Sequence, residues 1–386
     1  MKYLKIIIPI LFALAVALGI YQSQFNEAPP LSMVSQNSGN DSLEDYYNAT
    51  KGMAPQDQVS NISFFAVGDI MLSRSVASQM KRYGTDPQWP FNNIADTLST
   101  TDFNFGNLES PYSGSNDFSP PNSFLFNAPL WTLSGLLQNN FKVLNLANNH
   151  GLDQGKEGLF YTQKLLQENG VTHLGTGATQ AEAWRGSVYT AKGISVGFIG
   201  ASYASTNDGG KSKTNSTARL GDEELLQQSI AELKTRSDFI VVTMHAGTEY
   251  VRLPNESQIT FARAAIDFGA DMVIGAHPHW IQTTEQYKGK YIFYSLGNFI
   301  FDQEWSQDTK EGLMLKISLS KQGSCAGNPQ AACGNTLQGS NLGAKLKQIE
   351  LVPVIIENYG QPRLATEVEK EKILKKIGAT TTVITP

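Results

Sequence analysis

Short apolar runs recur along the chain from residue 61 onward, and each ends in or is followed by a glycine or a polar residue. Each run is six or seven residues long and rich in β-branched or aromatic side chains, which is typical of buried strands. The predicted strands are NISFFAV (61–67), FKVLNLA (141–147), ISVGFIG (194–200), FIVVTM (239–244), DMVIGA (271–276) and YIFYSL (291–296).

Segments with helical periodicity lie between several of these runs. Apolar residues at positions three or four apart predict helices over 158–168, 222–235 and 257–268. Alternation of strands and helices predicts a layered α/β or α+β domain. A further strand is expected at 345–356 and a charged helix at 368–378, whereas 207–217 is expected to be a polar loop.

The first residues of the chain are unlike the rest. Lys2 and Lys5 precede an uncharged apolar run over 6–20, shorter than the roughly 20 residues of a full membrane span. Flanking apolar residues can extend it if Lys5 snorkels to the headgroups. The basic residues on its N-terminal side predict that the following chain is exported. Two interpretations remain: an uncleaved signal anchor, favoured because no clear A-x-A exit follows, or a cleaved signal peptide that releases a secreted form.

These patterns divide the chain into four parts. Residues 1–21 are the signal anchor, and the polar residues 22–60 form a flexible extracytoplasmic tether with no sustained apolar period. The main domain covers 61–320, and 321–386 form a C-terminal extension. Cys325 and Cys333 lie in a loop of that extension, where a small disulfide and two free thiols are both compatible with the spacing.

The net charge of −5 and the pI near 5.6 argue against a nucleic-acid binder that relies on overall positive charge. Two cysteines are too few for a Cys-rich zinc site. Any metal site must therefore be built from histidines, carboxylates and amides.

Such residues gather at the ends of the predicted strands. Four of the five histidines lie within three residues of an apolar run, and His173 is the exception. The set at the strand ends is Asp69, Asn107, Glu109, Asn149, His150, His245, His277 and His279. Ligands of open α/β sheets bind beyond the carboxyl ends of the strands. Nitrogen and oxygen ligands without a thiolate predict one or two divalent ions, with Mn, Fe and Zn as candidates.

Each of these residues also has a simpler explanation. Asp69 could cap a helix, and Asn148 and Asn149 could form a turn. Glu109 could lie at the surface and His245 could bond backbone. The segment His277–Pro278–His279 is harder to explain in this way, because two imidazoles around a proline resemble a rigid pair of metal ligands. Taken together, the five motifs at successive strand ends favour one shared site.

Six motifs in order carry a family resemblance: FFAVGDIM, NFGNLESP, VLNLANNH, VVTMHAGTEY, VIGAHPH and YSLGNFIFD. They resemble the bacterial capsule-synthesis CapA family, and in particular the CapA/PgsA proteins of poly-γ-glutamate synthesis. The resemblance covers about residues 61–318. That family is similar in turn to calcineurin-type metallophosphatases, which implies a four-layer αββα sandwich.

The resemblance implies a ligand set by position. Asp69 takes the first aspartate position, Asn149 and His150 the Asn-His position, His245 the lone histidine, and His277 and His279 the last motif. Two departures stand out, because Met71 replaces a histidine and the segment Gly106–Glu109 replaces Gly-Asp. The bridging ligand is therefore either Asn107 or Glu109.

The same resemblance implies roles near the metal. His150, together with the ligand Asp69, is expected to be catalytic, with His150 protonating the leaving oxygen or stabilising the transition state. Asn148, Glu249 and Asn298 are candidates for supporting the ligands or contacting substrate, although helix capping or turn formation would also explain them.

Three functions follow as hypotheses. The first is a membrane-anchored component of capsule or poly-γ-glutamate production that acts outside the cytoplasm, with the polymer, the membrane and a synthase complex as partners. The second is a metal-dependent phosphoesterase for another envelope substrate, and the third is a non-catalytic accessory protein. A chain of net charge −5 would attract a polyanion only through a local basic patch or bound cations.

Overall fold

The computed structural model describes residues 59–203, 216–322 and 343–386. The expected signal anchor, nearly all of the tether, most of the polar loop and both cysteines lie outside these residues. Within the described part of the chain, no helix has both the length and the apolar character needed to cross a membrane.

The predicted apolar runs are strands because both faces of each sheet are covered. Alternate residues of β1 (Val59–Ile70) point to opposite sides: Phe64 and Ala66 face the second sheet, whereas Phe65 and Val67 face helices. A strand buried on both faces needs apolar residues at consecutive positions, which explains the unbroken NISFFAV run.

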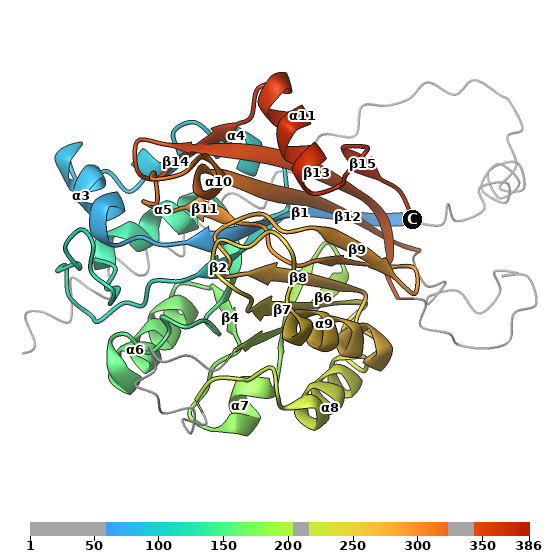
Figure 1. Cartoon of the computed structure of the whole chain (residues 1–386). Coiled ribbons are helices and arrows are strands. Elements are labelled where there is room, and N and C mark those ends of the chain that lie inside the picture. The colour runs from blue at the N-terminus through green and yellow to red at the C-terminus, as the bar shows by residue number, and fades with distance from the viewer. Residues whose placement is uncertain (1–58, 204–215, 323–342) are drawn as a thin grey trace, which may run out of the picture. The chain divides into compact units, whose positions relative to one another are not determined.

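The larger sheet has nine strands, in the order β14-β13-β12-β1-β2-β3-β4, with β11 paired to β1 and β15 paired to β13. Its parallel part, β1 to β4, contains the first predicted runs (Figure 1). Its other strands are β2 (Phe103–Leu108), β3 (Phe141–Asn145), β4 (Thr172–Leu174), β11 (Asn298–Ile300), β12 (Glu311–Gln322), β13 (Lys345–Glu357), β14 (Gln361–Leu364) and β15 (Val383–Ile384).

The smaller sheet has six strands, in the order β5-β6-β7-β8-β10-β9. Its central strands β6, β7 and β8 are parallel, so their carboxyl ends lie at one edge. The strands are β5 (Ser187–Ala191), β6 (Ile194–Ser202), β7 (Phe239–His245), β8 (Met272–Ala276), β9 (Thr284–Tyr287) and β10 (Lys290–Phe293).

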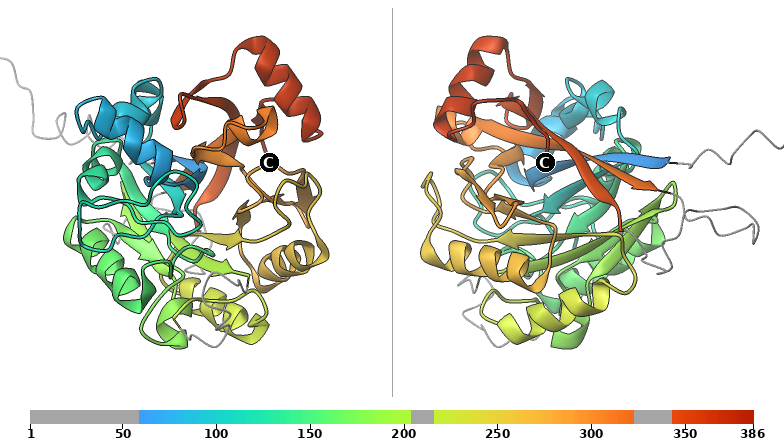
Figure 2. Two further views of the ribbon diagram at one scale, coloured as in Figure 1. Left: turned by 60° about the vertical axis from the view of Figure 1, so that its left-hand side comes forward. Right: turned by 90° about the vertical axis from the view of Figure 1, so that its right-hand side faces the viewer.

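Helices cover the outer face of each sheet, so the layers follow the order helix, sheet, sheet, helix (Figures 1 and 2). The core between the sheets includes Phe198, whose ring stacks on Phe105 at 5.3 Å. The mixed α/β fold expected from the sequence is confirmed. The helices are α3 (Arg74–Arg82), η1 (Trp89–Phe91), α4 (Ala95–Leu98), η2 (Leu130–Thr132), α5 (Leu133–Gln138), α6 (Gly155–Glu168), α7 (Gln180–Trp184), α8 (Glu223–Leu233), α9 (Glu256–Phe268), α10 (Gln307–Lys310) and α11 (Glu367–Lys376).

The strand and helix expected near the C-terminus are β13 and α11. Strand β13 pairs along β12, and Ile373 and Leu374 of α11 enter the core between the sheets. Figure 2 shows α11, in red, on the opposite side of the molecule from α8, in yellow. Residues 57–386 form one compact unit, so the parts predicted as 61–320 and 321–386 share a sheet.

Strand register sets a row of polar residues across the larger sheet. Asp69 is in register with Asn107 on one side and Asn298 on the other, and Asn107 is in register with Asn145. Gly68 permits the close approach of the neighbouring segment, because a Cβ there would lie 1.9 Å from the Gly297 carbonyl oxygen. The backbone thus delivers four polar side chains to one edge.

Candidate metal centre

Strand ends from both sheets bring together the residues that the sequence singled out. The larger sheet supplies Asp69 and Glu109, and the smaller sheet supplies His245 from the end of β7. His277 and His279 follow β8, and all five side chains are buried. Five residues that are up to 210 positions apart in the chain therefore share one site, as the strand-end pattern predicts.

The first group of possible ligands is Glu109, His245 and His277, whose ligand atoms all lie within 4.8 Å of one another. His245 Nε2 is 3.1 Å from His277 Nδ1, 3.8 Å from Glu109 Oε1 and 2.7 Å from Asn149 Oδ1. Two nitrogens bound to one cation at 2.0–2.1 Å in tetrahedral geometry would lie about 3.3 Å apart. The spacing of the imidazoles is therefore close to what a shared cation needs.

The second group is Asp69, Glu109 and His279, again with ligand atoms within 4.8 Å of one another. His279 Nδ1 is 3.5 Å from Asp69 Oδ2 and 2.8 Å from Asn298 Oδ1. Glu109 belongs to both groups. Its carboxylate thus lies where a bridging ligand would lie.

Glu109 is also the least satisfied polar residue of the site. It is fully buried, and neither carboxylate oxygen has a hydrogen-bond partner among the described residues. Burial raises the pKa of Glu109 well above its usual range, and the negative charges of Asp69 and Glu249 raise it further. A buried carboxylate without donors is costly unless a cation compensates it. The unpartnered Glu109 carboxylate therefore indicates that the residues of this site fit a metal ion.

His245 and His277 are neutral, as metal-binding imidazoles must be. Burial lowers the pKa of His245 and His277 well below the usual range, and the neighbouring imidazoles lower both further. Neutral imidazole is the form that binds a metal. His277 and His279 have φ angles of 102° and 57°, a left-handed conformation that is strained for residues other than glycine. Such strain is typical of functional sites.

The Asn107 side chain directs its amide nitrogen toward the candidate ligands and its amide oxygen away from them. Its amide nitrogen donates to Asp69 Oδ1 at 2.8 Å and lies 3.1 Å from His245 Nδ1. Its oxygen accepts from Asn145 at 2.8 Å and from Asn148 at 3.4 Å. Of the two bridging candidates, the geometry therefore favours Glu109. Asn145 was not predicted as part of the site. The available signal was its position as a polar residue inside the apolar run FKVLNLA.

His150 lies at the edge of the site, with its Nε2 atom 3.7 Å from Glu109 Oε1. Its Nδ1 atom is 2.6 Å from Asp153 Oδ2, and its ring stacks on Phe126 with centroids 3.8 Å apart. Both contacts fix the imidazole plane, and neither partner was predicted. A carboxylate three residues after the histidine was the available signal for Asp153.

The remaining candidates, Asn148, Asn298 and Glu249, differ in how directly they contact the candidate ligands and His150. Asn148 donates to the Leu108 carbonyl and accepts the His150 amide N–H, so it holds the loop that carries His150. Asn298 contacts His279 directly. Glu249 is exposed, and its charge acts on Glu109 from outside the ligand groups.

Comparison with known proteins identifies the family of this chain. The family model described as bacterial capsule synthesis protein PGA_cap matches residues 63–303, a range that includes every candidate site residue. The chain belongs to the PGA_cap family. The resemblance carried by the six motifs is confirmed.

Two curated relatives of this PGA_cap chain agree with that assignment. The PGA biosynthesis protein CapA of Bacillus subtilis (strain 168) is 32% identical over 269 residues, covering 69% of this chain and 70% of the relative. The capsule biosynthesis protein CapA of Bacillus anthracis is 31% identical over 283 residues, covering 71% of this chain and 68% of the relative.

Among solved structures, the calcineurin-like phosphoesterase YfkN from Bacillus subtilis matches with a TM-score of 0.39 and 13% identity. The match covers 83% of this PGA_cap chain and 96% of that one. A match at this level carries no argument about activity, so the chemistry of the site rests on its own residues.

The buried Glu109 carboxylate should make the free energy of unfolding depend on pH when a chelator keeps the protein free of metal. Its folded-state pKa lies above the ordinary value of 4.5, so a rising pH ionises the unfolded chain first and lowers the free energy of unfolding until the folded-state pKa is reached. Glu109→Gln removes this contribution. We expect its free energy of unfolding to exceed that of the wild type by an amount that grows as pH rises above 4.5, measured by urea denaturation.

The control is Glu371→Gln, a change of the same type at an exposed position on α11. Its stability should follow the wild type at every pH. A Glu109→Gln variant that is equally destabilised across the pH series would show that the carboxylate is satisfied in the fold.

Proposed function

We propose that this protein is a membrane-anchored, extracytoplasmic component of capsule or poly-γ-glutamate production, and that it works through a divalent-metal centre of the metallophosphoesterase type. The observation that carries the metal centre is the Glu109 carboxylate, which is buried, has no hydrogen-bond partner within the described ranges and is shared by two ligand groups. The polymer is supported by family membership and by the relatives named for PGA and capsule biosynthesis.

The residues that would hold metal fall into two positions. Glu109, Asn149, His245 and His277 would bind one ion, and Asp69, Glu109 and His279 the other. Bound divalent ions would supply Lewis acidity, which makes a water more acidic and stabilises negative charge on a phosphoryl oxygen. Asn107 would orient Asp69, to which its amide nitrogen donates a hydrogen bond. Asn298 would orient His279, whose Nδ1 atom its amide oxygen contacts.

His150 would act as the general acid. Asp153 holds its Nδ1 atom at 2.6 Å, which leaves Nε2 on the side that faces Glu109. The Asp153 carboxylate fixes the tautomer and would stabilise the charged imidazolium, as a positioning residue does for a catalytic histidine. In this arrangement His150 would protonate the leaving oxygen of a phosphoester of the cell envelope.

One observation favours a second function, a non-catalytic accessory that keeps the fold and binds polymer or synthase. Met71 occupies the place where the metallophosphatase pattern has a histidine, and its sulfur accepts the Ser73 amide N–H at 3.1 Å. That side chain supplies no ligand to the Asp69 position. The second ion would therefore be held more weakly than the first.

Metal content tests the centre directly. The full-length protein, purified in detergent without chelator, should carry stoichiometric transition metal, measured by plasma mass spectrometry. The double variant His245→Ala, His277→Ala should lose it, because two of the ligands around one ion are gone. His173→Ala is the matched control, since His173 lies outside both ligand groups, and it should retain the metal. Folded wild-type protein without metal would refute the proposed centre.

Catalysis is tested with an aryl phosphodiester. Metal-loaded wild type should hydrolyse it, and His150→Ala should lower the turnover by about 10²–10⁴-fold, the usual contribution of a general acid. Asp153→Asn should lower it less, because the imidazole keeps its place but loses the carboxylate. Metal content should be unchanged in both variants. Absence of turnover in metal-loaded wild type would favour the accessory function.

The membrane anchor is tested by deleting residues 1–21. The full chain should fractionate with membranes and be digested by protease added to intact cells stripped of their wall, because the basic residues precede the apolar run. The truncated chain should stay inside the cell. Full-length protein found in the soluble cytoplasmic fraction would contradict the anchor.

A further inference from the structure

A cavity of about 290 Å³ lies away from the metal centre, between α6 and the segment from β4 to β5. None of the candidate metal ligands lines it. Its wall contains His173, the one histidine that the strand-end pattern left without a role, now within β4. The volume is at the lower limit for small-molecule sites, which run from about 300 Å³. The cavity could therefore hold a short segment of a ligand.

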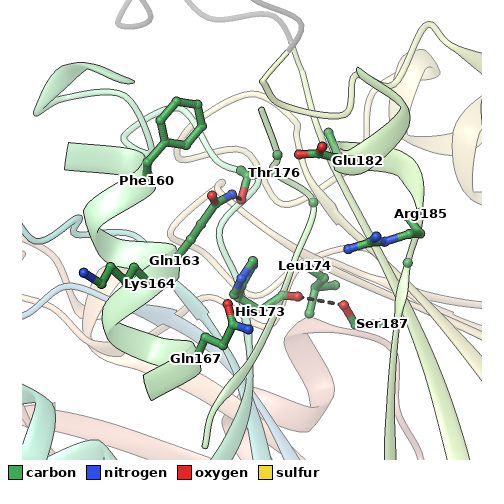
Figure 3. Close-up of a pocket in the computed structure, with 14 residues that line it drawn as sticks. Phe160, Gln163, Lys164, Gln167, His173, Leu174, Thr176, Glu182, Arg185 and Ser187 are labelled. Atoms are coloured by element: carbon green, nitrogen blue, oxygen red, sulfur yellow. Dashed lines mark hydrogen bonds between the residues drawn. The ribbon is translucent and has the colours of Figure 1, made fainter. Parts of the chain in front are cut away.

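The side chains reach this cavity from two sides. Figure 3 shows Gln163 and Gln167 of α6 on one side and Glu182 and Arg185 on the other, with His173 between them. Ser187 donates to the His173 carbonyl at 2.7 Å, which ties β5 to β4 at the cavity floor.

Two groups in this wall lack partners. The Nδ1 atom of His173 is buried without a hydrogen bond among the described residues. The Arg185 guanidinium makes no ion pair or hydrogen bond with that same part of the chain, and its side chain points into the cavity (Figure 3). Glu182 is already engaged, since its carboxylate accepts the Ala178 amide N–H at 2.8 Å. A ligand here would be met by an unengaged guanidinium and an imidazole.

The chemistry of the wall selects a carboxylate over a phosphate. A guanidinium presents parallel N–H groups that match a planar carboxylate. Arg185 is the one unengaged cation among the described residues of this wall and Glu182 carries the opposite charge, so a phosphate dianion would leave more uncompensated negative charge here than a singly charged carboxylate. Burial and the charge of Arg185 lower the pKa of His173, so its imidazole is neutral and can donate one hydrogen bond.

We propose that this cavity binds a carboxylate of the γ-glutamyl chain on Arg185 and His173, with the neighbouring amide of that chain against the Gln163 and Gln167 amides. The proposal rests on the proposed function for the identity of the polymer, and it deepens that function by naming a polymer-binding subsite. It also explains how a protein of net charge −5 could attract a polyanion, because Arg185 provides a local positive charge.

Titration calorimetry at constant ionic strength tests the subsite with the full-length protein. The probes are a short γ-linked oligoglutamate, its α-linked isomer and free glutarate. The wild type should bind the γ-linked oligomer most tightly. Arg185→Gln should weaken that binding about tenfold or more, because it removes the charge-assisted hydrogen bonds to the carboxylate.

Lys164→Gln is the matched control. Lys164 lies on the same wall and the change removes the same charge, but its side chain points away from the cavity (Figure 3) and pairs with Glu168. Its affinity for the γ-linked oligomer should equal that of the wild type. Arg185 is exposed, so both variants should keep the wild-type melting temperature.

Three results would overturn the subsite: equal loss of affinity in both variants, full affinity in Arg185→Gln, or no binding of any probe by the wild type. Glutarate or the α-linked isomer binding as tightly as the γ-linked oligomer would overturn the polymer assignment. Metal content is measured on the same preparations. A failed subsite with intact metal loading therefore leaves the proposed metal centre standing.

Discussion

The structure depends on one electrostatic constraint, the burial of the Glu109 carboxylate beside Asp69, where no residue of the described part of the chain donates a hydrogen bond to either of its oxygens. Folding gains nothing from two carboxylates in a dry interior, because each loses hydration and repels the other. The surrounding residues do not relieve this. They hold Asp69 by an Asn107 amide and by the His277 amide N–H, and they keep the nearby imidazoles neutral. That arrangement is destabilising by itself and becomes favourable when a cation supplies positive charge.

The backbone makes the constraint possible. Parallel strands in both sheets end at the same edge, and the register across β11, β1, β2 and β3 places Asn298, Asp69, Asn107 and Asn145 side by side. The left-handed φ angles of His277 and His279 turn both imidazoles toward that row, at a conformational cost that packing must offset. A single-residue slip of β1 would move Asp69 to the opposite face of the sheet, and the site would be lost.

The sequence predicted the site better than it predicted the sheets. The candidate ligands lie next to buried apolar runs, and such runs are visible without a structure, so Asp69, Glu109 and the three histidines could be singled out as candidates from the sequence. Strand β12 was missed, although the alternation of buried and partly exposed residues in its second half is itself typical of a strand with one covered face. Asp153 and Phe126 were missed because their role lies in contacts with His150. The direction of the Asn107 amide depends on Asn145 across the strand pair, and tertiary contacts of this kind leave no local pattern.

In the proposed function, the metal centre and the Arg185 cavity would both provide positive charge to an anionic polymer. Without cations the centre holds two carboxyl groups beside the neutral imidazoles of His245 and His277, and these groups offer a polyanion no positive charge. Each bound divalent ion would add two positive charges, so the field at the centre depends on how many ions bind. Arg185 is positive under all conditions, because a guanidinium does not lose its proton in the physiological range. An anionic chain could therefore be held at the cavity whether or not the weaker ion is present, and meet the centre only when it is loaded.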